Sequence, residues 1–235
     1  MNVAVIVAAG RGTRAGGGEG PKQFRLLACV PVLVHTLRRF EECETITKTI
    51  VVVPADSAEE FEASARVYDL KKLARLVAGG ATRTESVWKG IQSIDQSLDG
   101  AAVGVVAVHD GVRPFVAPAE IDAAVRAAEV HGAALLVAPV TDTIKEVREG
   151  SVVTTFERAS LRRALTPQCF RFDLLRRAYE RAIGEGLGAT DDSFLVERLG
   201  ATVVAVEGDP RNIKLTRPED FAAAETILRG MGDGG

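Results

Sequence analysis

Cationic side chains gather in a glycine-rich loop near the N-terminus. The apolar run 2–8 leads into "AAGRGTRAGGGEGPKQ", which holds six glycines, two arginines and one lysine. The backbone N–H groups of such a loop can surround phosphate oxygens, while an arginine fork and a lysine ammonium supply positive charge. The loop therefore predicts a triphosphate site in which Arg14 and Lys22 are the principal cations.

Two other phosphate-binding motifs fit this loop less well. Gly10, Gly12 and Ala15 have the spacing of a dinucleotide fingerprint, but "GGGEGP" at 16–21 cannot continue as the helix that this motif requires. The acidic ribose ligand of this motif would lie about 20 residues further on, at the end of the second strand, whereas the second predicted strand ends near Pro54. A Walker A motif is also disfavoured, because no Ser or Thr follows the lysine of "GEGPKQ".

Further chemistry is predicted at the ends of two later apolar runs. Asp110 follows the run 103–108, where a carboxylate can bind a divalent cation or a substrate hydroxyl, and Arg113 can anchor an acceptor or hold Asp110 in place. Lys214 follows the last run and precedes a helix, which places it at the carboxyl edge of a sheet. His109 is interpreted as structural, because a histidine that ends a buried strand is more often part of the core than a general base.

Alternating strands and helices must position these residues. Continuous apolar runs, typical of strands covered on both faces, occur at 2–8, 49–53, 74–78, 103–108, 134–138 and 202–206. Helical patterns occur at 31–43, 57–67, 83–96, 118–131, 172–185, 190–199 and 217–230. The order predicts an α/β fold with a single Rossmann-like, doubly wound, mostly parallel sheet over residues 1–230.

One segment interrupts this alternation. Residues 141–158 predict two short strands around Glu149 and Gly150, which is a hairpin signal in a chain otherwise built of strand–helix units. Its polar composition and missing helix partner indicate a projecting arm. The glycine-rich end, 231–235, is expected to be a flexible tail.

Composition excludes several classes of function. With 235 residues, 46% of them hydrophobic, the chain can bury a sizeable core, and a net charge of -3 argues against a general nucleic-acid binder. Three cysteines without metal-ligand spacing predict free thiols in a reducing compartment. No run of about 18 uncharged apolar residues and no cleavable leader pattern is found. We therefore expect a cytoplasmic protein that binds neither membranes nor nucleic acid.

Seven motifs, in order along nearly the whole chain, resemble those of a known family. "AAGRGTR" with "PKQF" is similar to the signature of the sugar and polyol phosphate nucleotidyltransferases, and within them to the cytidylyltransferases of 2-C-methyl-D-erythritol 4-phosphate in the non-mevalonate isoprenoid pathway. The similarity continues through "GGATRTESVWKG", "VHDGVRPF", "APVTDTIKEV", "ERASLRRALTPQCF", "TDDSFLVE" and "NIKLTRPED". It implies a transfer of cytidylyl from CTP to a polyol phosphate, with Mg²⁺ as cofactor.

The resemblance also implies residue roles. It makes Arg14, Lys22 and Lys214 the catalytic cations around the α-phosphate. The nucleotide-binding residues that it implies are Ala8, Ala9, Gly10, Gly12, Gly80 and Ser86, and Ala81 stands where some members carry Asp. For Asp110 and Arg113 it implies a place in the substrate site, and it leaves open whether Asp110 binds the metal or the polyol.

For the arm, the resemblance implies a role across a subunit interface. Thr143 and Arg158 would enter the acceptor site of the neighbouring subunit, with Thr166 nearby, so that the hairpin makes the protein a homodimer. Two alternatives remain open from the sequence. One is a ribitol 5-phosphate cytidylyltransferase, which shares much of the loop, and the other is an inactive nucleotide-binding regulatory module on the same fold.

Overall fold

A seven-stranded sheet forms the centre of the protein. The computed structural model describes residues 1–10, 21–94 and 102–232, and the strand order is β11-β7-β10-β6-β1-β4-β5. The strands are β1 Val3–Val7, β4 Lys48–Val53, β5 Leu73–Ala78, β6 Val105–Asp110, β7 Ala133–Pro139, β10 Arg162–Arg171 and β11 Val204–Glu207. All pairs are parallel except those that β10 makes with β6 and β7. The predicted mostly parallel, doubly wound sheet is confirmed.

Strand β10 is absent from the sequence-based prediction, which assigned six strands to the sheet. Its first three residues are exposed, two of them arginines, and its register breaks between Ala164 and Gln168, on either side of Pro167. Arginines and a proline interrupt the continuous apolar run by which a central strand is recognised.

Two short strands near the N-terminus, β2 Leu26–Leu27 and β3 Val30–Pro31, form a separate small sheet.

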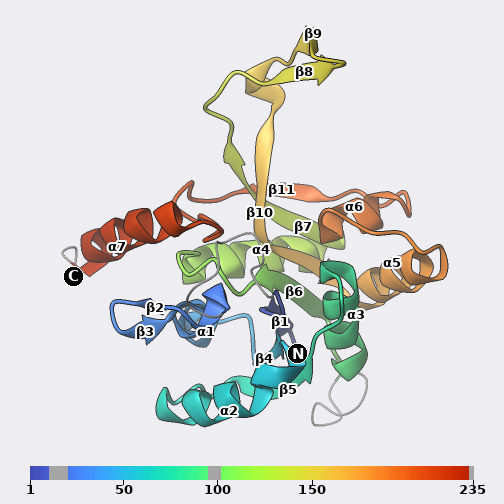
Figure 1. The fold of residues 1–235 in the computed structure, drawn as a ribbon. Coiled ribbons are helices and arrows are strands. Elements are labelled where there is room, and N and C mark those ends of the chain that lie inside the picture. The colour runs from blue at the N-terminus through green and yellow to red at the C-terminus, as the bar shows by residue number, and fades with distance from the viewer. Residues whose placement is uncertain (11–20, 95–101, 233–235) are drawn as a thin grey trace.

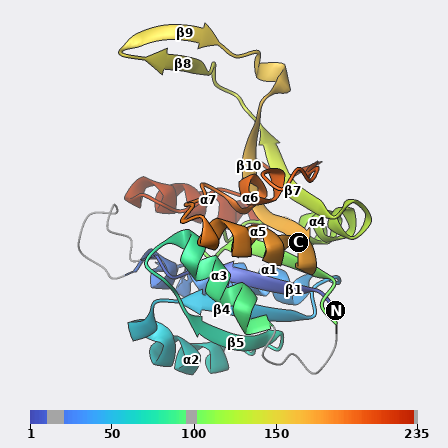
Figure 2. The same ribbon diagram turned by 90° about the vertical axis from the view of Figure 1, so that its right-hand side faces the viewer.

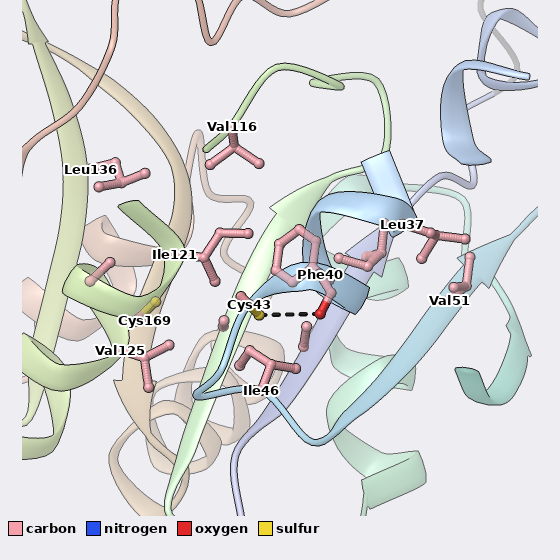
Figure 3. Close-up of a cluster of buried hydrophobic side chains, with 14 of the residues drawn as sticks. Leu37, Phe40, Cys43, Ile46, Val51, Val116, Ile121, Val125, Leu136 and Cys169 are labelled. Carbon is pink, nitrogen blue, oxygen red and sulfur yellow. Dashed lines mark hydrogen bonds between the residues drawn. The ribbon is translucent and has the colours of Figure 1, made fainter. Parts of the chain in front are cut away.

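Helices cover both faces of the sheet, as Figures 1 and 2 show. One face carries α1 Val32–Glu42, α2 Ala58–Val67 and α4 Pro118–His131, and the other carries α3 Arg83–Ile94, α5 Phe172–Gly184 and α6 Asp192–Glu197. Successive residues of β1 enter opposite cores: Ile6 packs with the first layer and Val5 with the second. Figure 3 shows the first core, where Phe40 of α1 lies close to Ile121 of α4.

The last helix, α7 Pro218–Gly232, packs on a third apolar cluster that includes Leu27, Phe115 and Leu215. It continues two residues beyond position 230, where the sequence analysis expected a flexible tail to begin. The remaining tail residues, 233–235, lie outside the described part of the chain.

The strand order creates a switch point beside β1. The chain passes from β1 outward to β4 and β5, then returns through α3 to β6 on the opposite side of β1. Val7 and Asp110, the last residues of β1 and β6, are register partners. Ligands of doubly wound sheets bind outside the carboxyl ends of the strands at such a point. The fold therefore places Asp110 where a ligand is expected.

The predicted hairpin arm is present. Strands β8 Lys145–Arg148 and β9 Ser151–Thr155 pair antiparallel, and Glu149 and Gly150 turn between them with φ of 48° and 79°. Positive φ at both turn positions matches the twist of a tight hairpin. Figures 1 and 2 show the arm extending well away from the body beyond β7 and β10.

None of the helices in the described ranges is long and apolar enough to cross a membrane.

Candidate active site

Asp110 is the centre of a charged cluster at the carboxyl end of β6. Lys214 Nζ lies 2.9 Å from Asp110 Oδ2, Arg113 Nε lies 3.3 Å from the same oxygen, and Arg83 Nε lies 3.4 Å from Oδ1. The Asp110 side chain is only 8% exposed, so the carboxylate meets these cations with little water between them. Lys214 and Arg113 share this one carboxylate, which favours an anionic ligand beside them, whereas Arg83 is also paired with Asp192.

The cations keep Asp110 ionised. Burial alone would raise its pKa, but Arg83, Lys214 and Arg113 together lower the pKa of Asp110 well below its usual range. His109, the residue before Asp110, is fully buried. Burial lowers the pKa of His109 to about 4, so this imidazole is neutral at physiological pH.

The neutral His109 orients Thr166. Its Nε2 lies 3.1 Å from the carbonyl oxygen of Arg113 and must donate there, so Nδ1 is left to accept the hydroxyl proton of Thr166 at 3.0 Å. The backbone N–H of Asp110 donates to Thr166 Oγ1 at 3.2 Å. These contacts agree with the interpretation of His109 as structural, and they tie Thr166 to the Asp110 backbone.

These groups open into a polar cavity of about 280 Å³. It is lined by Arg83, Asp110, Arg113, Ala164, Leu165, Thr166, Gln168, Thr190, Asp191 and Lys214. Four residues predicted for the site, Asp110, Arg113, Thr166 and Lys214, are therefore brought together from three separate stretches of the chain. The volume, and a lining with three cations and two carboxylates, suit a phosphate-bearing group.

The predicted nucleotide-binding residues adjoin this cavity along the sheet edge. A Cβ added to Gly111, the neighbour of Asp110, would lie 2.9 Å from Ala8 Cβ, and one added to Gly79 would lie 2.2 Å from Ala9 Cβ. Glycine is required at both positions because the backbones approach too closely for a side chain. Ala8 and Ala9 therefore lie between the Asp110 turn and the turn that precedes α3.

The turn before α3 is held by side-chain hydrogen bonds. Ser86 Oγ accepts from the backbone N–H of Gly80 at 3.0 Å and donates to the carbonyl oxygen of Thr82 at 2.8 Å. The carboxylate of Glu85 accepts from the backbone N–H of Ala81 at 2.8 Å. Gly80 of this turn and Ser86 of α3, both predicted to bind the base, are thus held together by a hydrogen bond.

The glycine-rich loop is described only at its two ends. Gly12 and Arg14 lie outside the described residues, while Gly10 is exposed and has open space around it. Lys22 begins a short 3₁₀ turn, and its neighbour Gln23 is buried and donates to the carbonyl oxygen of Ala8 at 2.6 Å. This bond anchors the far end of the loop beside β1, which brings Lys22 to the same sheet edge.

Thr143 and Arg158 are not among the residues that line the cavity of their own chain. Both are exposed residues of the arm segment, and Arg158 donates to the carbonyl oxygen of Thr141 at 2.8 Å. Their predicted place in a neighbouring subunit's site stays a prediction.

The donor set does not fit a resident metal cage. In the described part of the chain, no group of three or more His, Cys, Asp or Glu side chains lies where it could hold a metal ion. Asp110 offers one carboxylate, and both of its oxygens face cations. Mg²⁺ that arrives with a triphosphate takes most of its ligands from phosphate and water, so one protein carboxylate suffices for such a complex.

The structure adds site residues that the sequence analysis did not single out. Arg83, at the first position of α3, reaches Asp110 and also forms a bidentate pair with Asp192 of α6, at 2.9 and 2.8 Å. Gln168 of β10 lines the cavity and accepts from the backbone N–H groups of Asp192 and Ser193. The only sequence signal for Arg83 and Asp192 was their place within the motifs "GGATRTESVWKG" and "TDDSFLVE".

Fold and site together are those of a doubly wound α/β nucleotidyltransferase. The family model of the 2-C-methyl-D-erythritol 4-phosphate cytidylyltransferases matches residues 2–230. A curated relative of that name from Bacillus velezensis is 44% identical over 228 residues, which cover 97% of this chain and 95% of the relative. The chain belongs to the 2-C-methyl-D-erythritol 4-phosphate cytidylyltransferase family.

Solved structures agree with this assignment. A 4-diphosphocytidyl-2C-methyl-D-erythritol synthase from Anaerococcus prevotii superimposes with a TM-score of 0.83 at 27% identity, over 97% of this chain and 95% of that one. A 2-C-methyl-D-erythritol 4-phosphate cytidylyltransferase from Thermus thermophilus gives 0.78 at 31% identity, over 97% and 100%.

Proposed function

We propose that the protein joins CTP and 2-C-methyl-D-erythritol 4-phosphate, giving 4-diphosphocytidyl-2-C-methyl-D-erythritol and pyrophosphate, as a step of non-mevalonate isoprenoid biosynthesis. A phosphate oxygen of the acceptor attacks the α-phosphorus of CTP, and the bond to the pyrophosphate breaks. Family membership supports this reaction, because relatives of 40% identity or more over nearly the whole chain are named for it.

The observation that carries the proposal is the cluster of Lys214, Arg113 and Arg83 on Asp110 at the switch point. Phosphoryl and nucleotidyl transfers depend mainly on positioning and on stabilising the charge of the transferred group. In this proposal Lys214 neutralises the α-phosphate as the acceptor arrives, and Arg14 and Lys22 hold the departing pyrophosphate. The donor enters as its Mg²⁺ complex, so that the metal is part of the substrate, and Asp110 is the candidate protein ligand.

The arm supports a proposed homodimer. Its apolar side chains Val147, Val152, Val153 and Phe156 are 44–62% exposed, an unusual concentration on a slender hairpin. A second subunit that covers them would receive Thr143 and Arg158 in its acceptor site. We also propose a cytoplasmic location, since the three cysteines are free thiols, as expected in a reducing compartment.

Pyrophosphate release tests the reaction. The assay contains Mg²⁺, one of CTP, UTP, ATP or GTP, and either 2-C-methyl-D-erythritol 4-phosphate or D-ribitol 5-phosphate. Release confined to CTP with the erythritol phosphate is the expected result. Release with ribitol phosphate alone would keep the donor site and replace the acceptor, while CTP binding without release from either acceptor would indicate a regulatory module.

A further inference from the structure

We propose that Asp192 is a positioning residue for cytidylyl transfer, because through Arg83 it holds Asp110 and the base-binding turn in one fixed arrangement. The inference rests on the proposed function for its kinetic readout. It concerns a residue that lies behind the cavity rather than within it, since Asp192 is fully buried and is not part of the cavity lining.

The first step is the geometry of Arg83. Its two terminal nitrogens are both bound to the Asp192 carboxylate, which leaves Nε directed to Asp110. A bidentate pair restricts rotation of the guanidinium plane far more than a single contact does. The long Nε contact with Asp110 therefore depends on the short pair behind it.

The second step is the anchoring of Asp192 itself. The Tyr179 hydroxyl of α5 donates to Asp192 Oδ1, and the Tyr179 ring stacks on Trp88 of α3, with 6.2 Å between ring centroids. Gln168 Oε1 accepts from the Asp192 backbone N–H at 3.0 Å. Asp192 is thus held from α5 and from β10, and its carboxylate has little freedom to follow Arg83 if the cation moves.

The third step connects this pair to the nucleotide. Arg83 is the first residue of α3 and lies between Gly80 of the preceding turn and Ser86 of α3, whose Oγ accepts from the Gly80 N–H. A displacement of Arg83 would therefore change both the start of α3 and the environment of Asp110. One ion pair behind the cavity links the predicted base pocket to the charged centre.

Electrostatics agree with this geometry. Burial disfavours the charged form of Arg83, yet Asp192, followed by Asp110, raises its pKa above the usual range. Without the Asp192 carboxylate, Arg83 would be a partly buried cation that competes with Lys214 and Arg113 for the single carboxylate of Asp110. A loss of one partner from a buried pair is costly for this reason.

The test compares Asp192→Asn with Tyr179→Phe, and with Asp173→Asn as a control that removes an exposed carboxylate from α5. Each variant is checked by circular dichroism, CTP binding is measured by calorimetry without acceptor, and kcat and KM are measured from pyrophosphate release. Asp192→Asn is expected to lower kcat about a hundredfold, the scale of a misplaced catalytic group, and to weaken CTP binding about tenfold. Tyr179→Phe should lower kcat about threefold, the scale of one hydrogen bond, and the control should match the wild type.

A double-mutant cycle separates positioning from simple destabilisation. In an Asp110→Asn background, Asp192→Asn should reduce kcat/KM much less than it does alone, because the group that it positions is already changed. Additive losses, or unchanged kcat and CTP affinity in a folded Asp192→Asn protein, would overturn the inference. If Asp192→Asn does not fold, Tyr179→Phe decides, and wild-type kinetics for it would be the contrary result. If the wild type releases no pyrophosphate, the proposed function fails and CTP affinity alone judges Asp192.

Discussion

Lys214 Nζ contacts Asp110 Oδ2 at 2.9 Å although one residue ends β6 and the other lies between β11 and α7. Two hydrogen bonds, one on each side of Lys214 in the sequence, bring these segments together. The Leu215 backbone N–H donates to the carbonyl oxygen of Val112 at 2.9 Å, and Arg113 donates to the carbonyl oxygen of Asn212 at 2.8 Å. The lysine is therefore fixed by its backbone while its side chain remains 38% exposed to the cavity.

Replacement of Lys214 by alanine should affect turnover far more than folding. We expect Lys214→Ala to lower kcat about 100- to 1000-fold, the scale of removing one group that stabilises transition-state charge. The free energy of unfolding should change by less than about 1 kcal/mol, because Asp110 keeps Arg83 and Arg113 as partners. Pyrophosphate release and urea unfolding measure the two effects.

Lys71→Ala is the matched control for this variant, since it removes a 78% exposed lysine whose carboxylate partner, Asp69, is equally exposed. Turnover of the control should equal that of the wild type. A Lys214→Ala protein that turns over normally would remove Lys214 from the catalytic group.

The Thr166 hydroxyl should contribute to stability through its two partners. Thr166→Val keeps the shape of the side chain but leaves His109 Nδ1 and the Asp110 N–H unsatisfied. We expect a loss of about 1–3 kcal/mol in the free energy of unfolding, the cost of a buried unsatisfied polar group. Thr166→Ser keeps the hydroxyl and should lose less. Equal stability of the Val and Ser variants in urea titrations would contradict this hydrogen-bond assignment.

The buried His109 should make stability fall in mild acid. Its pKa is about 4 in the folded protein and about 6.5 in an unfolded chain, so between these values only the unfolded state takes up the proton. The free energy of unfolding should therefore be pH-independent with respect to this group above about pH 6.5, and should fall by roughly 3 kcal/mol toward pH 4.

Urea unfolding at several pH values measures this slope, and His109→Gln should flatten it although the variant is less stable at neutral pH. Burial also lowers the pKa of His35, so a smaller slope of the same sign should remain in the variant. An unchanged slope in His109→Gln would show that other groups cause the acid sensitivity.

Much of this fold could be predicted because six of the seven sheet strands are covered on both faces or lie beside such strands, and so contain continuous apolar runs. Asp110 could be predicted because it follows one of these runs, whereas the role of Lys214 was predicted from the resemblance of the motif "NIKLTRPED". Strand β10 could not, because Arg163 and Pro167 interrupt its apolar pattern. The pair Arg83–Asp192 could not either, because it joins two helix starts far apart in the sequence, and charged residues at helix starts usually face solvent.

The homodimer proposal predicts that two defective chains restore activity when they are mixed. Arg158→Ala removes the side chain that an arm would deliver to its neighbour. Lys214→Ala removes the catalytic lysine of the cavity that would receive that side chain. In a mixed dimer, the cavity of the Arg158→Ala chain is intact and receives an unaltered arm from its partner. After co-refolding at equal amounts, we expect about one quarter of wild-type activity, because half of the dimers are mixed and each has one complete site.

If each arm instead served its own chain, every site in the mixture would lack either Arg158 or Lys214, and no activity would return. The Arg158→Ala chain alone should show a raised KM for the acceptor and nearly unchanged CTP affinity, so the mixture is assayed at an acceptor concentration where that chain is almost inactive. A chain that carries both substitutions, mixed with wild type in equal amounts, should give about one quarter of wild-type activity if arms are exchanged and about one half if each arm serves its own chain. Sedimentation of the same mixtures reports the oligomeric state, and a monomer would refute the arm as a dimer contact.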